Sequence, residues 1–122
     1  MERIFLTIGA LSAFIGVGAG AFGAHGLKHK ISSEMLDIFE IGVRYQMYHA
    51  LALLAVAWTL SKWPSSLVVT SGWLFLVGTL LFSGSLYQMS LTGAKWLGMI
   101  TPIGGFCFLI GWLCLALGIW KN

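Results

Sequence analysis

Charged residues divide this 122-residue chain into four long uncharged runs. The eleven Lys, Arg, Asp and Glu residues (7 + 4) lie at the ends of the chain and between the runs Ile4–Leu27, Tyr45–Ser61, Trp63–Ala94 and Trp96–Trp120. About 20 residues of apolar helix cross the hydrocarbon core of a bilayer. A Lys or Arg at the centre of such a helix costs about 2.5–3.5 kcal/mol on insertion scales. The pattern therefore predicts a membrane protein with four crossings.

The composition agrees with a membrane protein and excludes several other classes. Hydrophobic residues make up 58% of the chain and charged residues 9%, whereas about 25% of the residues in soluble domains are charged. The seven basic residues are scattered, so no patch for binding nucleic acid is indicated. The lipid bilayer is the partner that this composition predicts.

We expect an all-α fold, a four-span transmembrane helix bundle with up-down topology, in a single domain of residues 1–122. The predicted spans are about 4–26, 42–61, 66–89 and 96–120. An amphipathic segment, about 33–41, would lie at the membrane surface and lead into the second span, with Ser32 or Ser33 as its N-cap and Glu34 in its first turn. Pro64 predicts the end of the second helix, and Pro102 predicts a kink or a delayed start in the fourth.

The first run has one alternative interpretation, as a signal peptide. Arg3 precedes it, and the small residues 19–21 resemble a cleavage site. However, the run is longer than the usual apolar region of 7–15 residues. We therefore expect it to be retained as a true span.

Small residues recur at helical spacing in the first and last runs, which predicts close helix packing. In lipid, small residues allow helix backbones to approach each other. The last run carries the clearer repeat, with alternate steps of three and four residues, and it could face either another span or another copy of the protein. The predicted packing seam comprises Ser12, Gly16, Gly20, Ala24, Gly104, Cys107, Gly111, Cys114 and Gly118.

An up-down bundle would also bring most polar side chains of the spans together in one leaflet. The end of the first span, the start of the second, the end of the third and the start of the fourth share one side of the membrane. The candidate polar cluster at these ends comprises His25, Arg44, Tyr45, Gln46, Tyr48, His49, Ser83, Ser85, Tyr87, Gln88 and Thr101.

Three members of this cluster have two interpretations each. Arg44 could bind an anionic substrate or lipid headgroup, or could reach the interface and pair with Glu40. His49 could relay protons, but a hydrogen bond across helices, to a partner such as Tyr87 or Gln88, is the more common role. His25 and His29 have the spacing of metal ligands on a helix, but Gly26 between them favours an interfacial loop.

The sequence contains no pattern typical of an enzyme active site or of a cofactor site. No nucleophile–base–acid set, phosphate-binding loop or zinc spacing is present, so we expect no catalytic residues, no cofactor and no metal. Cys107 and Cys114 are seven residues apart, about 10 Å along a helix, which is too far for a disulfide.

Four segments resemble one known family in matching order. They are GAFGAHGL at 20–27, YQMYHALAL at 45–53, FSGSLY at 82–87 and ITPIGG at 100–105. The chain is similar, over nearly its full length, to the small bacterial inner-membrane proteins grouped as domain of unknown function 423. The resemblance implies a multi-pass protein of the bacterial cytoplasmic membrane and implies no particular activity.

Two hypotheses of function remain open at this stage. In the first, the protein is a structural or accessory helix bundle of unassigned role that associates with itself or with a larger membrane complex. In the second, it is a small transporter or channel subunit whose polar cluster forms a site for a small molecule that the sequence does not identify. Such carriers tend to use a carboxylate inside the membrane, and every acidic residue here lies outside the span centres.

Overall fold

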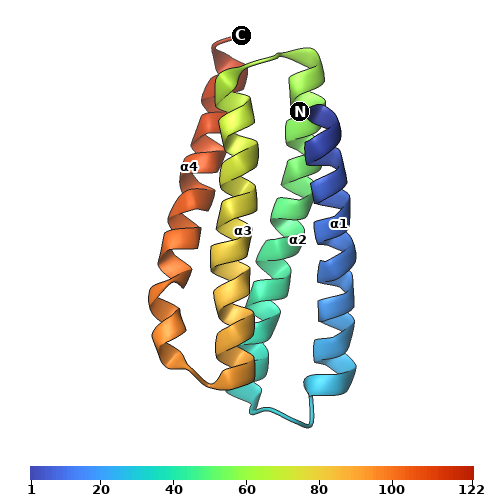
Figure 1. The fold of residues 1–122 in the computed structure, drawn as a ribbon, viewed down its shortest axis with the longest axis vertical. Helices are drawn as coiled ribbons and strands as arrows, with labels where there is room; N and C mark the ends of the chain where they lie inside the picture. The colour runs from blue at the N-terminus through green and yellow to red at the C-terminus, as the bar shows by residue number, and fades with distance from the viewer.

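Four long helices run alternately up and down in the computed structural model, which describes all 122 residues (Figure 1). They are α1 (Glu2–Phe22), α2 (Ser33–Lys62), α3 (Ser66–Thr92) and α4 (Thr101–Trp120). A π-helical segment, η1 (Gly23–Leu27), extends α1, and a 3-10 segment, η2 (Lys95–Met99), precedes α4. Both chain ends lie at the same end of the molecule (Figure 1). The predicted all-α class and the up-down order of the helices are therefore confirmed.

The helices begin and end at residues whose local chemistry explains the boundary. The Ser32 hydroxyl accepts a hydrogen bond from the Met35 N–H, as expected for an N-cap. Ser65 caps α3 through the Leu67 N–H. Gly93 ends α3 with a φ of 74°, a left-handed conformation that glycine adopts without a steric penalty. Pro102 lies in the first turn of α4, so the predicted delayed start of the fourth helix is confirmed.

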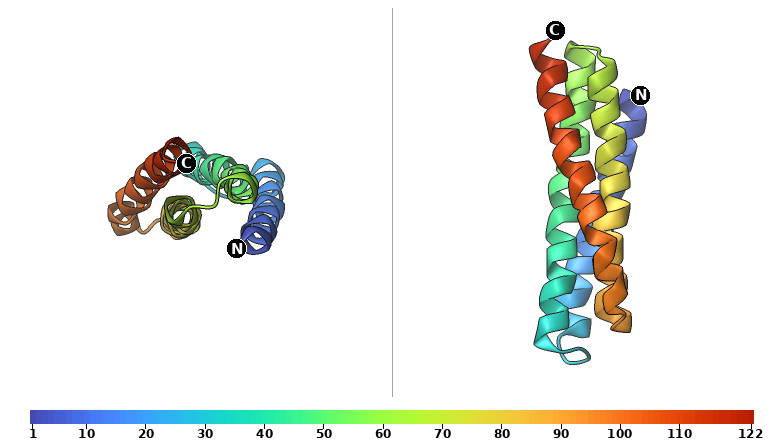
Figure 2. Two further views of the ribbon diagram at one scale, coloured as in Figure 1. Left: turned by 90° about the horizontal axis from the view of Figure 1, so that it is seen from above. Right: turned by 90° about the vertical axis from the view of Figure 1, so that its left-hand side faces the viewer.

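Each helix packs along the helix that follows it in the chain. Viewed from above, α4 and α1 lie at opposite ends of the group, with α2 and α3 between them (Figure 2). Phe5, Leu53, Val56 and Phe75 are among the largest fully buried side chains. The core therefore lies around α2 and α3, and α2 has neighbours on both sides.

Three helical stretches are long and apolar enough to cross a membrane: Glu2–Leu27, Ser66–Thr92 and Lys95–Trp120. Helix α2 is not among them. Four of its first twelve residues are charged, and Gln46 and His49 follow soon after. The predicted crossing by residues 42–61, and the surface position of residues 33–41, therefore stay predictions at this point.

Candidate functional site

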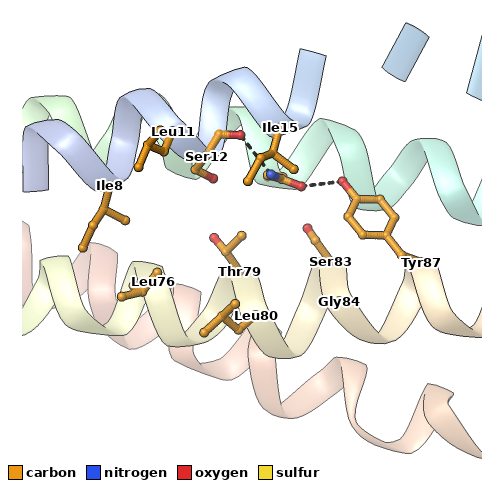
Figure 3. Close-up of a pocket in the computed structure, with 11 residues that line it drawn as sticks. Ile8, Leu11, Ser12, Ile15, Leu76, Thr79, Leu80, Ser83, Gly84 and Tyr87 are labelled. Atoms are coloured by element: carbon orange, nitrogen blue, oxygen red, sulfur yellow. Dashed lines mark hydrogen bonds between the residues drawn. The ribbon is translucent and has the colours of Figure 1, made fainter. Parts of the chain in front are cut away.

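A hydrogen-bonded chain centred on Gln46 connects three helices. The Gln46 side-chain amide N–H donates to the backbone oxygen of Ser12 in α1, at 2.9 Å. The Tyr87 hydroxyl of α3 donates to the Gln46 side-chain oxygen. Figure 3 shows both bonds as dashed lines between the helices. Gln46 itself is buried, and both ends of its side chain therefore have partners.

Two serines of α3 make further contacts between helices. Ser83 donates to the backbone oxygen of Gly42 in α2, at 2.6 Å. The Ser85 and Thr101 hydroxyls lie 2.6 Å apart, which joins α3 to α4. Hydrogen bonds between membrane helices stabilise a bundle modestly, by about 0.6 kcal/mol on average. These contacts therefore link α3 to α2 and to α4 with a modest contribution to stability.

His49 is the most enclosed ionisable side chain of the cluster, and both of its ring nitrogens have partners. Nδ1 lies 2.8 Å from the backbone oxygen of Tyr45, and the indole N–H of Trp112 in α4 donates to Nε2 at 3.1 Å. A carbonyl only accepts and an indole N–H only donates, so the ring must be neutral, with its proton on Nδ1. The ring also stacks on Phe108, with ring centroids 3.6 Å apart.

His49 does make a hydrogen bond across helices, as expected, but its partner is Trp112 and not one of the residues suggested by the sequence. Tyr87 and Gln88 were predicted, but Tyr87 bonds to Gln46 instead and Gln88 is exposed. The helix rotation explains the difference, because His49 faces α4 while Gln46, three residues earlier, faces α1 and α3. Residues one helical turn apart on α2 therefore bond to different neighbouring helices.

Other predicted members of the cluster lie apart from these contacts. His25, Arg44, Tyr48 and Gln88 are exposed. The Tyr45 ring packs on Phe82, with centroids 4.7 Å apart. The structure thus brings Gln46, His49, Ser83, Ser85, Tyr87 and Thr101 into contacts between helices and leaves the charged and surface-facing members outside them.

Most of the predicted packing seam lies against neighbouring helices of the same chain. In α4, a Cβ placed at Gly111 would lie 2.8 Å from the Phe75 ring, and one at Gly118 would lie 2.7 Å from Val68. A Cβ at Gly104 would lie 2.9 Å from the backbone oxygen of Gly78. Cys107 and Cys114 beside these glycines are half-buried free thiols. The seam of α4 therefore faces α3.

The seam of α1 faces α2 over only part of its length. A Cβ at Gly16 would lie 2.7 Å from the Met47 sulfur, and one at Gly20 would lie 3.3 Å from Val43. Ser12 is half-buried and offers its backbone oxygen to Gln46, whereas Ala24 is exposed. The four positions thus follow one helix face, and their packing ends before η1.

Trp112 is the contact residue that the sequence interpretation missed. It lies within the last apolar run, and its side chain is 45% exposed while its indole N–H donates to His49. An indole N–H in apolar surroundings usually finds an acceptor. The last apolar run contains Trp96, Trp112 and Trp120, and only Trp112 lies away from the ends of the run. Its need for an acceptor is the signal that could have pointed to a polar partner on a neighbouring helix, such as His49.

The interior of the bundle leaves no polar side chain without a partner. No buried side-chain nitrogen or oxygen lacks a hydrogen bond. No group of three or more His, Cys, Asp or Glu residues is close enough to hold a metal ion. The buried polar side chains can therefore cross-link the helices, because each of them already has a hydrogen-bond partner within the protein.

Comparison with known proteins identifies the family. Residues 19–105 match the family described as "Protein of unknown function (DUF423)". The UPF0382 membrane protein YwdK of Bacillus subtilis is 46% identical over 120 residues, covering 98% of each chain. The chain belongs to the DUF423 family. The predicted resemblance is therefore confirmed.

Other relatives agree with this membership. A UPF0382 membrane protein of Staphylococcus saprophyticus is 48% identical over 119 residues, covering 98% of each chain. One from Staphylococcus aureus is 50% identical over 119 residues, covering 98% of this chain and 97% of the relative. No solved structure gives a significant match. The relatives' names say membrane protein and state no activity, so this DUF423 member is a membrane protein of unassigned function.

Proposed function

We propose that the protein resides in the bacterial cytoplasmic membrane and crosses it four times, with both termini on one side. The position of α2 supports the fourth crossing, because α2 packs along both α1 and α3, which are apolar enough to span. Its contacts with α1 extend from Val43, opposite Gly20, to Leu54, opposite Gly9. A helix that contacts two crossing helices over such a length has to share their depth in the bilayer.

The outward face of α2 also suits lipid. Within residues 45–61, the exposed positions are Tyr45, Tyr48, Leu51, Ala55, Trp58 and Ser61, which recur at helical spacing and carry no charge. The acidic side chains of α2 are confined to its first eight residues, and Glu34, Asp37 and Glu40 are exposed there. We therefore place residues 33–41 at the membrane surface and residues 42–61 within the bilayer.

We further propose a structural or accessory role, with no catalytic activity of its own. The pairing of the interior polar groups carries this proposal. Gln46, His49, Ser83 and Tyr87 bond to other parts of the bundle, so they act as cross-links of a rigid body. A transport pathway would instead need polar groups free to bind a solute or a proton.

Proton flux into reconstituted vesicles tests this role. Vesicles with an internal pH-sensitive dye receive a pH gradient, and a protonophore serves as the positive control. We expect the wild type and His49→Gln to give the same slow dissipation as empty vesicles. Faster dissipation with the wild type that is lost in His49→Gln would contradict the accessory role and favour a transporter.

Association with another copy or with a larger membrane complex would use the outer faces of the helices. The α4 seam is occupied by α3, and the α1 seam packs on α2 as far as Gly20. The outer face of α4 instead carries large exposed side chains such as Phe106, Leu109 and Leu113. Cysteine crosslinking at positions 109 and 113 tests this arrangement, whereas dimers formed through position 111 would contradict it.

A further inference from the structure

An open groove separates α1 from α3 on one side of the bundle. Its volume is about 340 Å³, and Gln46 of α2 forms part of its floor. Figure 3 shows Ile8, Leu11 and Ile15 on one side of the space and Leu76 and Leu80 on the other. The groove follows the long axes of the two helices.

The groove exists because α1 approaches α3 at one end only. Near the start of α1, the Phe5 ring fills the space beside Gly72 and packs on Trp73, with ring centroids 5.2 Å apart. Farther along, α1 packs on α2, as the contact between Gly20 and Val43 shows. At Gly84, an added Cβ would find no atom within 4 Å. The separation of the two helices therefore leaves a space that no side chain of this protein fills.

The lining of the groove favours hydrocarbon over water. Five of its residues are Ile or Leu. Most polar groups of the lining are already engaged, since Thr79 donates to the backbone oxygen of Phe75, Ser83 donates to Gly42, and Gln46 bonds to Tyr87 and to the backbone oxygen of Ser12. The Ser12 hydroxyl is the one lining donor without a hydrogen bond, and a bound water needs two to four polar partners. An empty space in contact with lipid would also lose the dispersion contacts of its walls.

We propose that one acyl chain of a bilayer phospholipid lies lengthwise in this groove. The inference rests on the proposed placement of α1 and α3 across the membrane, which aligns the groove with the lipid chains. From Leu76 to Tyr87 the groove extends about 16 Å along α3. Its volume corresponds to about eleven water-sized groups of about 30 Å³ each, which suits a run of methylenes.

Gly84→Leu fills the groove, and Gly18→Leu is its matched control. Neither position has a neighbour within 4 Å of an added Cβ, so a side chain can be attached at either one without displacing a neighbour at its base. Gly84 lines the groove and also borders a smaller pocket beside Leu97 and Ile100, whereas Gly18 lies on the outer face of α1, beside Phe14 and Val17. The two variants add the same side chain and differ in whether it occupies the groove.

Native mass spectrometry of the full-length protein, released from membranes in mild detergent, measures the bound lipid. We expect wild type and Gly18→Leu to retain one phospholipid, and Gly84→Leu to retain it with an occupancy about tenfold lower. Equal occupancy in the two variants would overturn the proposal. Retention of an isoprenoid lipid instead of a phospholipid would also overturn it.

A photoreactive phospholipid with a diazirine in its acyl chain gives a second measurement. In reconstituted vesicles, we expect crosslinks at Leu76 and Leu80 to exceed those at Leu109 and Leu113 on the outer face of α4. Leu80 is about as exposed as these two controls, so excess labelling at Leu80 would reflect the groove and not exposure alone. Uniform labelling of all four positions would overturn the acyl-chain site. This result is independent of the flux assay, so failure of the lipid site and failure of the accessory role can be told apart.

Discussion

The two sides of α3 differ in how they meet their neighbours. On one side, α4 presents glycines to bulky groups of α3, such as Gly111 to Phe75 and Gly118 to Val68. On the other side, α1 touches α3 near Phe5 and then leaves a groove beside Gly84. The glycines of α4 thus allow α3 to approach closely, whereas Gly84 of α3 borders an open space.

This difference predicts that an added side chain will destabilise the protein strongly on the α4 side of α3 and hardly at all beside the groove. Helices in lipid associate largely through close packing and hydrogen bonds, because lipid chains are as apolar as the side chains they would replace. A side chain inserted between α3 and α4 has to displace its neighbours. A side chain inserted at Gly84 starts in open space and does not have to displace another part of the protein.

Gly104→Leu should have the largest effect on stability. A Cβ at this position would lie 2.8 Å from the Cβ of Phe82 and 2.9 Å from the backbone oxygen of Gly78, so the helices themselves have to move. We expect a loss of about 3 kcal/mol in the free energy of unfolding, measured in detergent micelles by circular dichroism. Gly105→Leu is the control, because a Cβ there would have only ordinary contacts at 3.8 Å. Equal losses in both variants would show that α4 does not pack on α3 as described.

His49→Leu should have the next largest effect. It leaves the Trp112 N–H without its acceptor and removes the stack on Phe108. We expect a loss of about 2 kcal/mol. Adding Trp112→Phe removes the unpaired donor, so the double variant should lose less than the sum of the two single changes. Strict additivity in this cycle would show that the two rings do not interact.

Tyr87→Phe should cost less. It removes the hydroxyl that donates to Gln46 while the ring stays in place beside Phe39 and Gly42. We expect a loss of about 0.6 kcal/mol in the same unfolding assay. Tyr48→Phe is the matched control, since Tyr48 is exposed, and it should have no measurable effect. A larger loss at Tyr48 would place that side chain in a contact that the structure lacks.

Gly84→Leu should have the smallest effect on stability. Its new side chain enters open space, so we expect a change within about 0.5 kcal/mol of the wild type. Thermal unfolding in the same detergent measures it. A loss comparable with that of Gly104→Leu would mean that α1 and α3 pack tightly here, and the contrast between the two sides of α3 would disappear.

Sequence patterns predicted the helices well because their signals are local. Uninterrupted apolar runs, Ser32 before α2 and Pro102 at the start of α4 each act within one or two turns. The convergence of polar residues was predicted in outline, and Gln46, Ser83, Ser85 and Thr101 do make contacts between helices.

The choice of partners could not be predicted, because it depends on how each helix rotates about its axis. That rotation is set by the fit of large side chains against glycines on other helices, such as Phe108 beside Gly78. It directs His49 toward Trp112 instead of Tyr87. The groove forms where α1 diverges from α3 while it packs on α2. Because it depends on how three helices are placed, no pattern within a single helix could predict it.

The sidedness of the chain ends tests the central claim, that α2 crosses the bilayer together with α1, α3 and α4. Single cysteines at positions 1, 64, 94 and 122 of a variant lacking Cys107 and Cys114 can be labelled in intact cells with a reagent that does not cross the membrane. Four crossings predict that positions 1, 64 and 122 share one side and that position 94 lies on the other. Labelling that places positions 1 and 122 on opposite sides would contradict the account, because it requires an odd number of crossings.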